Sequence, residues 1–481
     1  MEKTKNEKMS KFAFFAMTAS LFITVYEYPT FATSGKSLIF FLLLCGLCWF
    51  LPVSLCSAEL ATVEGYQEGG IYSWVGKPLG EKFGFAALFF QWFQVTVGFV
   101  TMIYFIVGTL SYTLEIPAIN NDPVFKFLSV IGIFWVLTIL QLRGTETTAK
   151  LAKYGFSIGI VLPVIAMFIL SIHYFMSGHP ISPDFSHSSF IPKGKDMAAL
   201  TSFVLAYMGV EASATHISEL ENPKKDYPKL LIILVVVGIV MSTIGGSVVS
   251  MVLSGNISSN QGVMDTASTL ISPHHISWGV KLIGFLISFG ILAQVSSWIV
   301  SPTEGLQFAA TKGLLPADLA KKNRNEVPVK ILMIQAIIVT AWAALLTFGS
   351  GGSGGNIAFQ TAISLTVLIY LSAYILFFVA YFVVLKKHQH LQRDFQIPGG
   401  NKVKMLVAGS GLLLSISAVV TAFIVPSSIS KNEGSMYLTL LAVCFLVTLA
   451  IPFAFYHFYS LPNKKKITEH KGELSREDGQ K

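Results

Sequence analysis

The segment FVLAYMGVEASATHISELENPKKDYP, residues 203–228, begins as an apolar membrane sequence and then becomes polar. Gly209 and Glu211 follow the apolar run directly, and a loop rich in lysine and proline ends the segment. Because a carboxylate inside hydrocarbon is costly on every scale, Glu211 is expected to face a protein-lined or water-filled path. The segment therefore predicts a membrane helix that is interrupted around a binding site.

Composition places the whole chain in the membrane class. Of its 481 residues, 53% are hydrophobic and 12% are charged, and the mean hydropathy is +0.63, whereas a soluble domain has about 25% charged residues. Twelve apolar runs are long enough to cross about 30 Å of hydrocarbon, which predicts an all-α polytopic membrane protein. The expected spans are residues 12–33, 37–60, 84–112, 124–142, 153–176, 198–218, 230–253, 279–301, 329–348, 357–385, 404–425 and 436–460.

Basic residues set the expected orientation. Most of the 34 Lys and Arg residues fall in the amino-terminal segment, in alternate loops and in the carboxyl tail, whereas the other loops hold few, such as Lys36, Lys193 and Lys195. By the positive-inside rule, both termini, residues 1–11 and 461–481, are predicted to be cytoplasmic. The net charge of +8 follows from this bias, so the basic loops are expected to face anionic lipids and not nucleic acid.

No catalytic, metal or cofactor site is expected. The sequence has neither the H-E-x-x-H zinc motif nor the G-x-S-x-G nucleophile motif, so an enzyme is not predicted. All the cysteines lie in apolar spans and are interpreted as packing residues, because a secreted disulfide framework would not place them there. They are Cys45, Cys48, Cys56 and Cys444.

The first span has an interruption of its own, VYEYPT at residues 25–30. Pro29 has no amide hydrogen, so the carbonyl of Val25 is expected to lack its helical partner. Freed backbone is tolerated in a membrane only where protein or a cavity surrounds it. The alternative is a simple proline kink with the glutamate bonded to a neighbouring helix. The candidate binding residues here are Tyr26, Glu27 and Tyr28.

The two interruptions match each other, since Tyr207, Gly209 and Glu211 of the sixth span repeat the pattern of an aromatic residue and a glutamate beside a helix breaker. If spans one to five (12–176) are repeated upside down by spans six to ten (198–385), the interruptions correspond, as in transporters with inverted repeats. The last two spans, 404–460, are then additional. Further candidates for substrate binding, with ordinary packing as the alternative, are Gln294, Trp298, Tyr370 and Tyr374.

Three strings resemble signatures of the amino acid, polyamine and organocation transporter superfamily, and they occur in its order. They are SAELAT at residues 57–62, ELENP at 219–223, and GLLP at 313–316 followed by VPV at 327–329. The resemblance covers nearly the whole chain. It implies a LeuT-like fold of five plus five helices in inverted repeat, with helices one and six interrupted and two helices added.

At the subfamily level, three strings are similar to the bacterial glutamate/γ-aminobutyrate antiporters of acid resistance. They are VYEYPTFATSG at 25–35, YMGVEASATH at 207–216 and SWIV at 297–300. The resemblance implies exchange of external glutamate for internal γ-aminobutyrate across the bacterial plasma membrane, together with a cytoplasmic glutamate decarboxylase. Gln294 stands where that subfamily has a glutamate, so glutamine/glutamate exchange and proton-coupled symport stay open, as does an amino-acid sensor of another class.

Several smaller expectations remain. The candidates for proton coupling are Glu211, Glu27 and His216, since histidine titrates near neutral pH and a carboxylate in acid.

Gln91 and Gln94 share a helix face and are expected to form interhelical hydrogen bonds. Residues 302–316 predict a short amphipathic helix on the inner face. The tail is expected to be solvated.

Overall fold

The structure is a computed structural model that describes residues 10–67, 69–274, 276–349, 354–426, 429 and 432–464. Within these ranges, the side chains of residues 145–147, 149, 195, 214–216, 218–219, 301 and 354–359 are not described. The only β pairing among the described residues is an isolated bridge between Val63 and Arg393. All other regular structure in the described ranges is helical, which confirms the all-α class.

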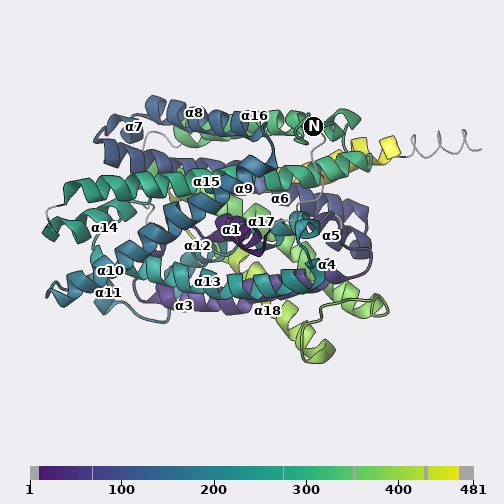
Figure 1. Cartoon of the computed structure of the whole chain (residues 1–481), viewed down its shortest axis with the longest axis horizontal. Helices are drawn as coiled ribbons and strands as arrows, with labels where there is room; N and C mark the ends of the chain where they lie inside the picture. Colours follow the sequence, from purple (N-terminus) through teal and green to yellow (C-terminus); the bar gives the residue numbers. More distant parts are fainter. Residues whose placement is uncertain are drawn as a thin grey trace, which may run out of the picture.

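Ten helices in the described part of the chain are long and apolar enough to cross a membrane (Figure 1). The prediction of a polytopic membrane protein is therefore confirmed. α6 and α17 contribute mostly buried residues to the centre, whereas α8 and α18 expose large apolar side chains as lipid-facing helices do. The spanning segments are α3 to α4 (Ser37–Thr62), α6 (Glu81–Leu114), α8 (Pro123–Gln141), α9 to α10 (Lys150–Met176), α13 (Pro223–Val252), α15 (Ser277–Thr311), α16 (Val329–Phe348), α17 (Gly354–Lys387), α18 (Gly400–Thr421) and α19 with its extension (Gly434–Lys464).

The first predicted span is divided. α1 (Lys11–Phe22) ends where Ile23 and Thr24 become extended, with ψ of 99° and 96°. A single 3₁₀ turn, η1 (Val25–Glu27), and the short helix α2 (Tyr28–Ala32) follow. Neither part has spanning length by itself.

The sixth predicted span is divided in the same way. α12 (Leu200–Leu205) ends in a turn, and Gly209 has φ of +111°, a left-handed conformation that glycine adopts without steric cost. The 3₁₀ helix η5 (Val210–Glu219) continues the segment. Both predicted spans are therefore interrupted, and the total of twelve spans stays a prediction because neither segment is continuous.

The break in the first span lies earlier than Pro29 suggested. The carbonyl of Val25 is not free, because it accepts a hydrogen bond from the amide of Tyr28. Pro29 stands in the first turn of α2, where a missing amide hydrogen leaves no bond unmade. The expectation of an unpaired carbonyl at Val25 is therefore wrong, and the extended residues are Ile23 and Thr24.

The predicted amphipathic helix over 302–316 is also wrong as a separate element. α15 runs from Ser277 to Thr311 through Pro302 without ending. Pro302 removes one backbone hydrogen bond, but the helix beyond it packs against α6, since a Cβ on Gly305 would meet Leu88 at 2.6 Å. Burial of this last part of α15 stabilises the continuous helix.

Both ends of the described chain lie at the same end of the bundle. Lys11 pairs with Asp226 at 2.9 Å, and Lys464 pairs with Glu81. Asn463 also donates to the carbonyl of Gly313 at 3.1 Å, so residues 461–464 of the predicted tail are held, while residues 465–481 lie outside the described part. We call this the terminal end; that it faces the cytoplasm stays a prediction.

Short helices cover both ends of the bundle. Figure 1 shows α5 near the terminal end and α14 at the opposite end. These elements lie in the connections between spans. They are α5 (Ile71–Leu79), α7 (Ala118–Asn121), α11 (Pro183–His187), α14 (Gly262–Ile271) and η7 (Ala317–Ala320).

Candidate functional site

A small cavity lies between the two interrupted segments. Its free volume is about 20 Å³, enough for one water molecule and far too small for an amino acid. Side chains must therefore move before a substrate can enter. The polar and aromatic residues of its lining are Thr24, Tyr26, Gln94, Thr101, Trp298, Thr366 and Tyr370.

Glu211 lies next to this cavity and is almost fully buried, with 1% of its surface exposed. Tyr374 donates a hydrogen bond of 2.5 Å to one carboxylate oxygen. The other oxygen accepts bonds from Tyr370 and from Gln91, the latter at 3.1 Å. All three partners are neutral, so the carboxylate is held by hydrogen bonds and not by a neighbouring cation.

The two tyrosines reach one carboxylate because of their spacing on α17. Tyr370 and Tyr374 are at positions i and i+4, which places them on the same helix face, and their rings are 4.6 Å apart. The hydroxyl of Tyr374 also accepts the amide hydrogen of Gly209 at 3.0 Å. α17 therefore holds both the carboxylate and the backbone at the break before η5.

Trp298 connects the two interruptions. Its indole nitrogen donates to the carbonyl of Leu21 at 2.8 Å, at the end of α1. On its other side, a Cβ at Gly209 would meet the Trp298 ring at 2.5 Å, so only glycine fits there. One turn earlier on α15, Gln294 lies 3.5 Å from the carbonyl of Ile23. α15 thus supplies the donors that the broken α1 lacks.

Tyr28 and Tyr207 are not brought to the cavity. Their hydroxyls donate to backbone carbonyls of other helices, Tyr28 to Met241 at 3.3 Å and Tyr207 to Leu42 at 3.1 Å. The Tyr207 ring is also stacked on Phe50, with centroids 4.9 Å apart. Both tyrosines therefore occupy packing positions in this structure.

The contacts of the other two candidates for proton coupling, Glu27 and His216, are less fully defined than those of Glu211. Glu27 is completely buried, and neither carboxylate oxygen has a hydrogen-bond partner among the described residues. The carbonyl oxygen of the Gln294 side chain is also buried and has no hydrogen-bond partner among the described residues. The side chain of His216 lies outside the described part, so its proton role stays a prediction.

Gln91 was not among the predicted site residues. The sequence indicated an interhelical hydrogen bond for it, and that expectation is confirmed, but the partner is Glu211. For Gln94 the prediction was wrong, because its amide bonds within α6, to the carbonyl of Gln91 at 3.2 Å; its side chain reaches the cavity. Two buried glutamines on one face of a central helix were the signal that could have identified Gln91.

The cysteines and the possible metal ligands form no further site in the described part of the chain. All four cysteines are free thiols, and Cys45 and Cys56 are buried. In the described ranges, no group of three or more His, Cys, Asp or Glu side chains is arranged to hold a metal ion.

Comparison with known proteins agrees with this architecture. The amino acid permease family matches residues 9–448. Two relatives named glutamate/γ-aminobutyrate antiporter, from Lactococcus lactis subsp. lactis and subsp. cremoris, are 53% and 52% identical; each alignment covers 96% of this chain and 93% of the relative. An uncharacterised transporter of Legionella pneumophila is 32% identical over 89% of this chain and 90% of its own. The chain therefore belongs to the amino acid permease family.

Proposed function

We propose that the protein exchanges extracellular glutamate for intracellular γ-aminobutyrate by alternating access in the bacterial plasma membrane. The observation that carries the proposal is a buried carboxylate, Glu211, held by two tyrosines at a break in a membrane segment. The names of the two Lactococcus lactis relatives supply the substrates. The predicted orientation, with both termini in the cytoplasm, defines the direction of exchange.

The substrate is bound at its charged ends. Helix amino termini favour anions, so the amides at the start of η5 suit the carboxylate of an amino acid. The carbonyls of Leu21 and Ile23, at the break that follows α1, accept its ammonium group once the substrate displaces the Trp298 indole and the Gln294 amide that bond to them here. Tyr26, Trp298 and Tyr370 line the cavity between these ends and enclose the carbon chain.

Proton coupling is assigned to Glu211, with Glu27 and His216 as further candidates. Both glutamates are buried beside an interruption, where a change of charge alters the cost of moving the segment. A cytoplasmic glutamate decarboxylase is the proposed functional partner, because decarboxylation consumes a proton and yields γ-aminobutyrate. Each cycle of exchange then removes acid from the cell.

Counterflow in liposomes tests the proposal. Purified protein is reconstituted into vesicles loaded with γ-aminobutyrate, and entry of labelled glutamate is measured at acid pH. Entry should be accelerated at least about tenfold over empty vesicles, which corresponds to about 1.4 kcal/mol in the barrier. Entry that follows the pH gradient and ignores the internal solute would mean symport. Binding of glutamate without entry would mean a sensor.

Gln294 favours a second candidate, the exchange of glutamine for glutamate. Its amide lies beside the end of α1 and carries a buried carbonyl oxygen without a described partner, which an amide substrate could satisfy. Vesicles loaded with glutamine in place of γ-aminobutyrate separate the two candidates. Acceleration by glutamine alone would replace the first proposal with the second.

A further inference from the structure

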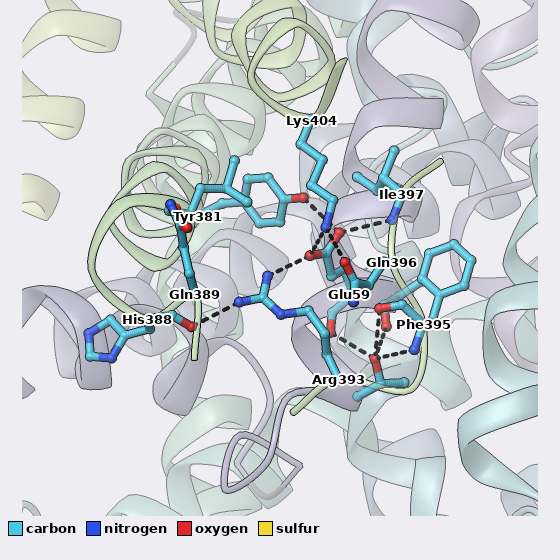
Figure 2. A network of polar contacts seen from close by, with 12 residues as sticks. Glu59, Tyr381, His388, Gln389, Arg393, Phe395, Gln396, Ile397 and Lys404 are labelled. Atoms are coloured by element: carbon cyan, nitrogen blue, oxygen red, sulfur yellow. Dashed lines mark hydrogen bonds and ion pairs between the residues drawn. The ribbon is translucent and has the colours of Figure 1, made fainter. Parts of the chain in front are cut away.

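Another buried carboxylate, Glu59, is held by Tyr381, which lies two turns after Tyr374 on α17. Glu59, near the end of α4, is completely buried and is contacted by two cations, Arg393 at 2.6 Å and Lys404 at 2.7 Å (Figure 2). Its other oxygen accepts bonds of 3.0 Å from the Tyr381 hydroxyl and the Ile397 amide. Both cations are also buried, with 6% and 3% of their side chains exposed.

The partners of Glu59 come from two helices and the connection between them. Tyr381 comes from α17 and Lys404 from α18, while Arg393 and Ile397 belong to the connection between these helices. Because Glu59 is the carboxylate that both buried cations contact, its loss would leave Arg393 and Lys404 without this counter-charge out of water. The cluster is therefore a permanent anchor for the connection.

We call this connection, residues 388–399, the strap. Besides its bonds to Glu59, it pairs with α4 through the backbone of Phe395, whose amide donates to Thr62 at 3.2 Å. It reaches α13 by a single ion pair, Asp394 with Lys224 at 2.7 Å. Three consecutive residues of the strap, 393–395, thus contact α4 and α13 in turn.

The two helices that the strap contacts, α4 and α13, border a groove of about 600 Å³ at the terminal end. Thr62 of α4 and Lys224 of α13 both line it, as does Ile217 of η5. η5 carries Glu211, and only residues 220–222 separate η5 from α13. The start of α13 is therefore joined to the interrupted segment at the candidate site by three residues.

The two attachments of the strap differ in strength. The anchor at Glu59 is buried and fully hydrogen-bonded, whereas Lys224 and Asp394 are 63% and 33% exposed. Exposed ion pairs contribute little and are screened by salt. The contact with α13 can be broken at low cost while the anchor stays intact.

We propose that the strap gates the groove at the terminal end, with Glu59 as its fixed anchor and the Lys224–Asp394 pair as a releasable latch. When the latch opens, α13 and η5 move away from the strap and connect the groove with the central cavity. The exchange assay rests on the proposed function. The rate of cysteine labelling at position 217 needs no substrate, so it tests the latch independently of that function.

Cross-linking tests whether the latch must open. Lys224→Cys and Asp394→Cys are combined, oxidised, and assayed for exchange before and after reduction. The disulfide should lower exchange at least tenfold, with recovery on reduction, while each single cysteine variant stays active under oxidant. Exchange at the uncross-linked rate after complete cross-linking would overturn the proposal.

The rate at which a thiol reagent labels a buried residue of the groove tests the latch without any substrate. Ile217→Cys, at a position that is 7% exposed, is treated with a membrane-impermeant thiol reagent from the terminal side. Adding Asp394→Asn should raise the labelling rate at least fivefold, and the charge exchange Lys224→Asp with Asp394→Lys should return it to the starting value. An unchanged rate in Asp394→Asn overturns the latch even if exchange fails for other reasons.

A matched control and an anchor variant complete the test. Asp318 is an exposed carboxylate paired with Lys321 at 2.7 Å and Lys330 at 3.0 Å, outside the groove lining. Asp318→Asn should leave labelling unchanged. Glu59→Gln should lower the melting temperature, whereas Asp394→Asn should not. A similar drop in both would overturn the distinction between anchor and latch, and if Glu59→Gln does not fold, the Asp394→Asn melting temperature alone decides.

Discussion

At the scale of single residues, the position of Glu211 in an apolar span identified it as a candidate site residue. The side chains that bond to it come from distant parts of the chain. Glu211 stands out in the sequence because few charges occur in apolar spans. Its partner Gln91 is 120 residues away, and Tyr370 is 159 residues away. Neither contact can be read from local spacing, although the i, i+4 relation of Tyr370 and Tyr374 correctly indicated a shared face.

The substitution Glu211→Gln tests this residue directly. Glutamine keeps the shape and can still bond to the tyrosines, but it cannot bind or release a proton, so the pH dependence of glutamate uptake should flatten. Uptake at acid pH should fall at least about tenfold, or about 1.4 kcal/mol. Insertion into the membrane should be unaffected.

A matched glutamate serves as the control for this measurement. Glu326 is 84% exposed and has only a loose contact with Lys322 at 3.9 Å. Glu326→Gln should keep the wild-type pH profile. If Glu211→Gln also kept that profile, Glu211 would have no part in proton coupling.

At the scale of elements, the broken helix α1 depends on α15 for its missing hydrogen bonds. Proline and glycine indicated the two interruptions, because both residues change the backbone locally. They did not indicate which helix would satisfy the freed carbonyls. The carbonyl of Leu21 is paired with Trp298, a contact across 277 residues.

Trp298→Phe is expected to weaken this support. Phenylalanine retains an aromatic ring but leaves the carbonyl of Leu21 unpaired inside the bundle, at a cost of about 1–3 kcal/mol. The melting temperature in detergent and the exchange rate should both fall. Trp278→Phe, on the same helix but 66% exposed, should change neither. Equal melting temperatures for the two variants would contradict the role given to the indole.

At the scale of the whole molecule, glycine lets central helices cross closely. A Cβ on Gly290 of α15 would lie 2.6 Å from the carbonyl carbon of Gly159, in the π-helical turn before α10. Small residues at such crossings allow backbones to approach, which is how membrane helices associate without a hydrophobic driving force. The position of α15, and with it Trp298 and Gln294, depends on this contact.

Gly290→Ala should therefore destabilise the bundle. The added methyl group overpacks the crossing, for which about 1–3 kcal/mol is typical. Thermal unfolding in detergent measures the change. Gly132→Ala is the control, since a Cβ there meets nothing within 4 Å and alanine favours a helix by up to about 1 kcal/mol. Similar melting temperatures for both alanine variants would show that the crossing tolerates a side chain.

The sequence by itself determined the membrane class, the positions of most spans, the two interruptions and the buried carboxylate at the second one. Each of these follows from local properties: hydrophobicity over about 20 residues, the backbone limits of proline and glycine, and the cost of a charge in hydrocarbon. The prediction failed where packing overrides local preference, as in α15, which continues through Pro302 because its far end is buried against α6.

The tertiary structure alone decided which side chains meet. It placed Tyr28 and Tyr207 away from the cavity and brought Gln91 to Glu211. It also paired Glu59 with two cations more than 300 residues later, Arg393 of the strap and Lys404 of α18. Such pairings depend on how distant helices pack, and buried polar groups must find partners wherever the fold supplies them. No local pattern encodes that choice.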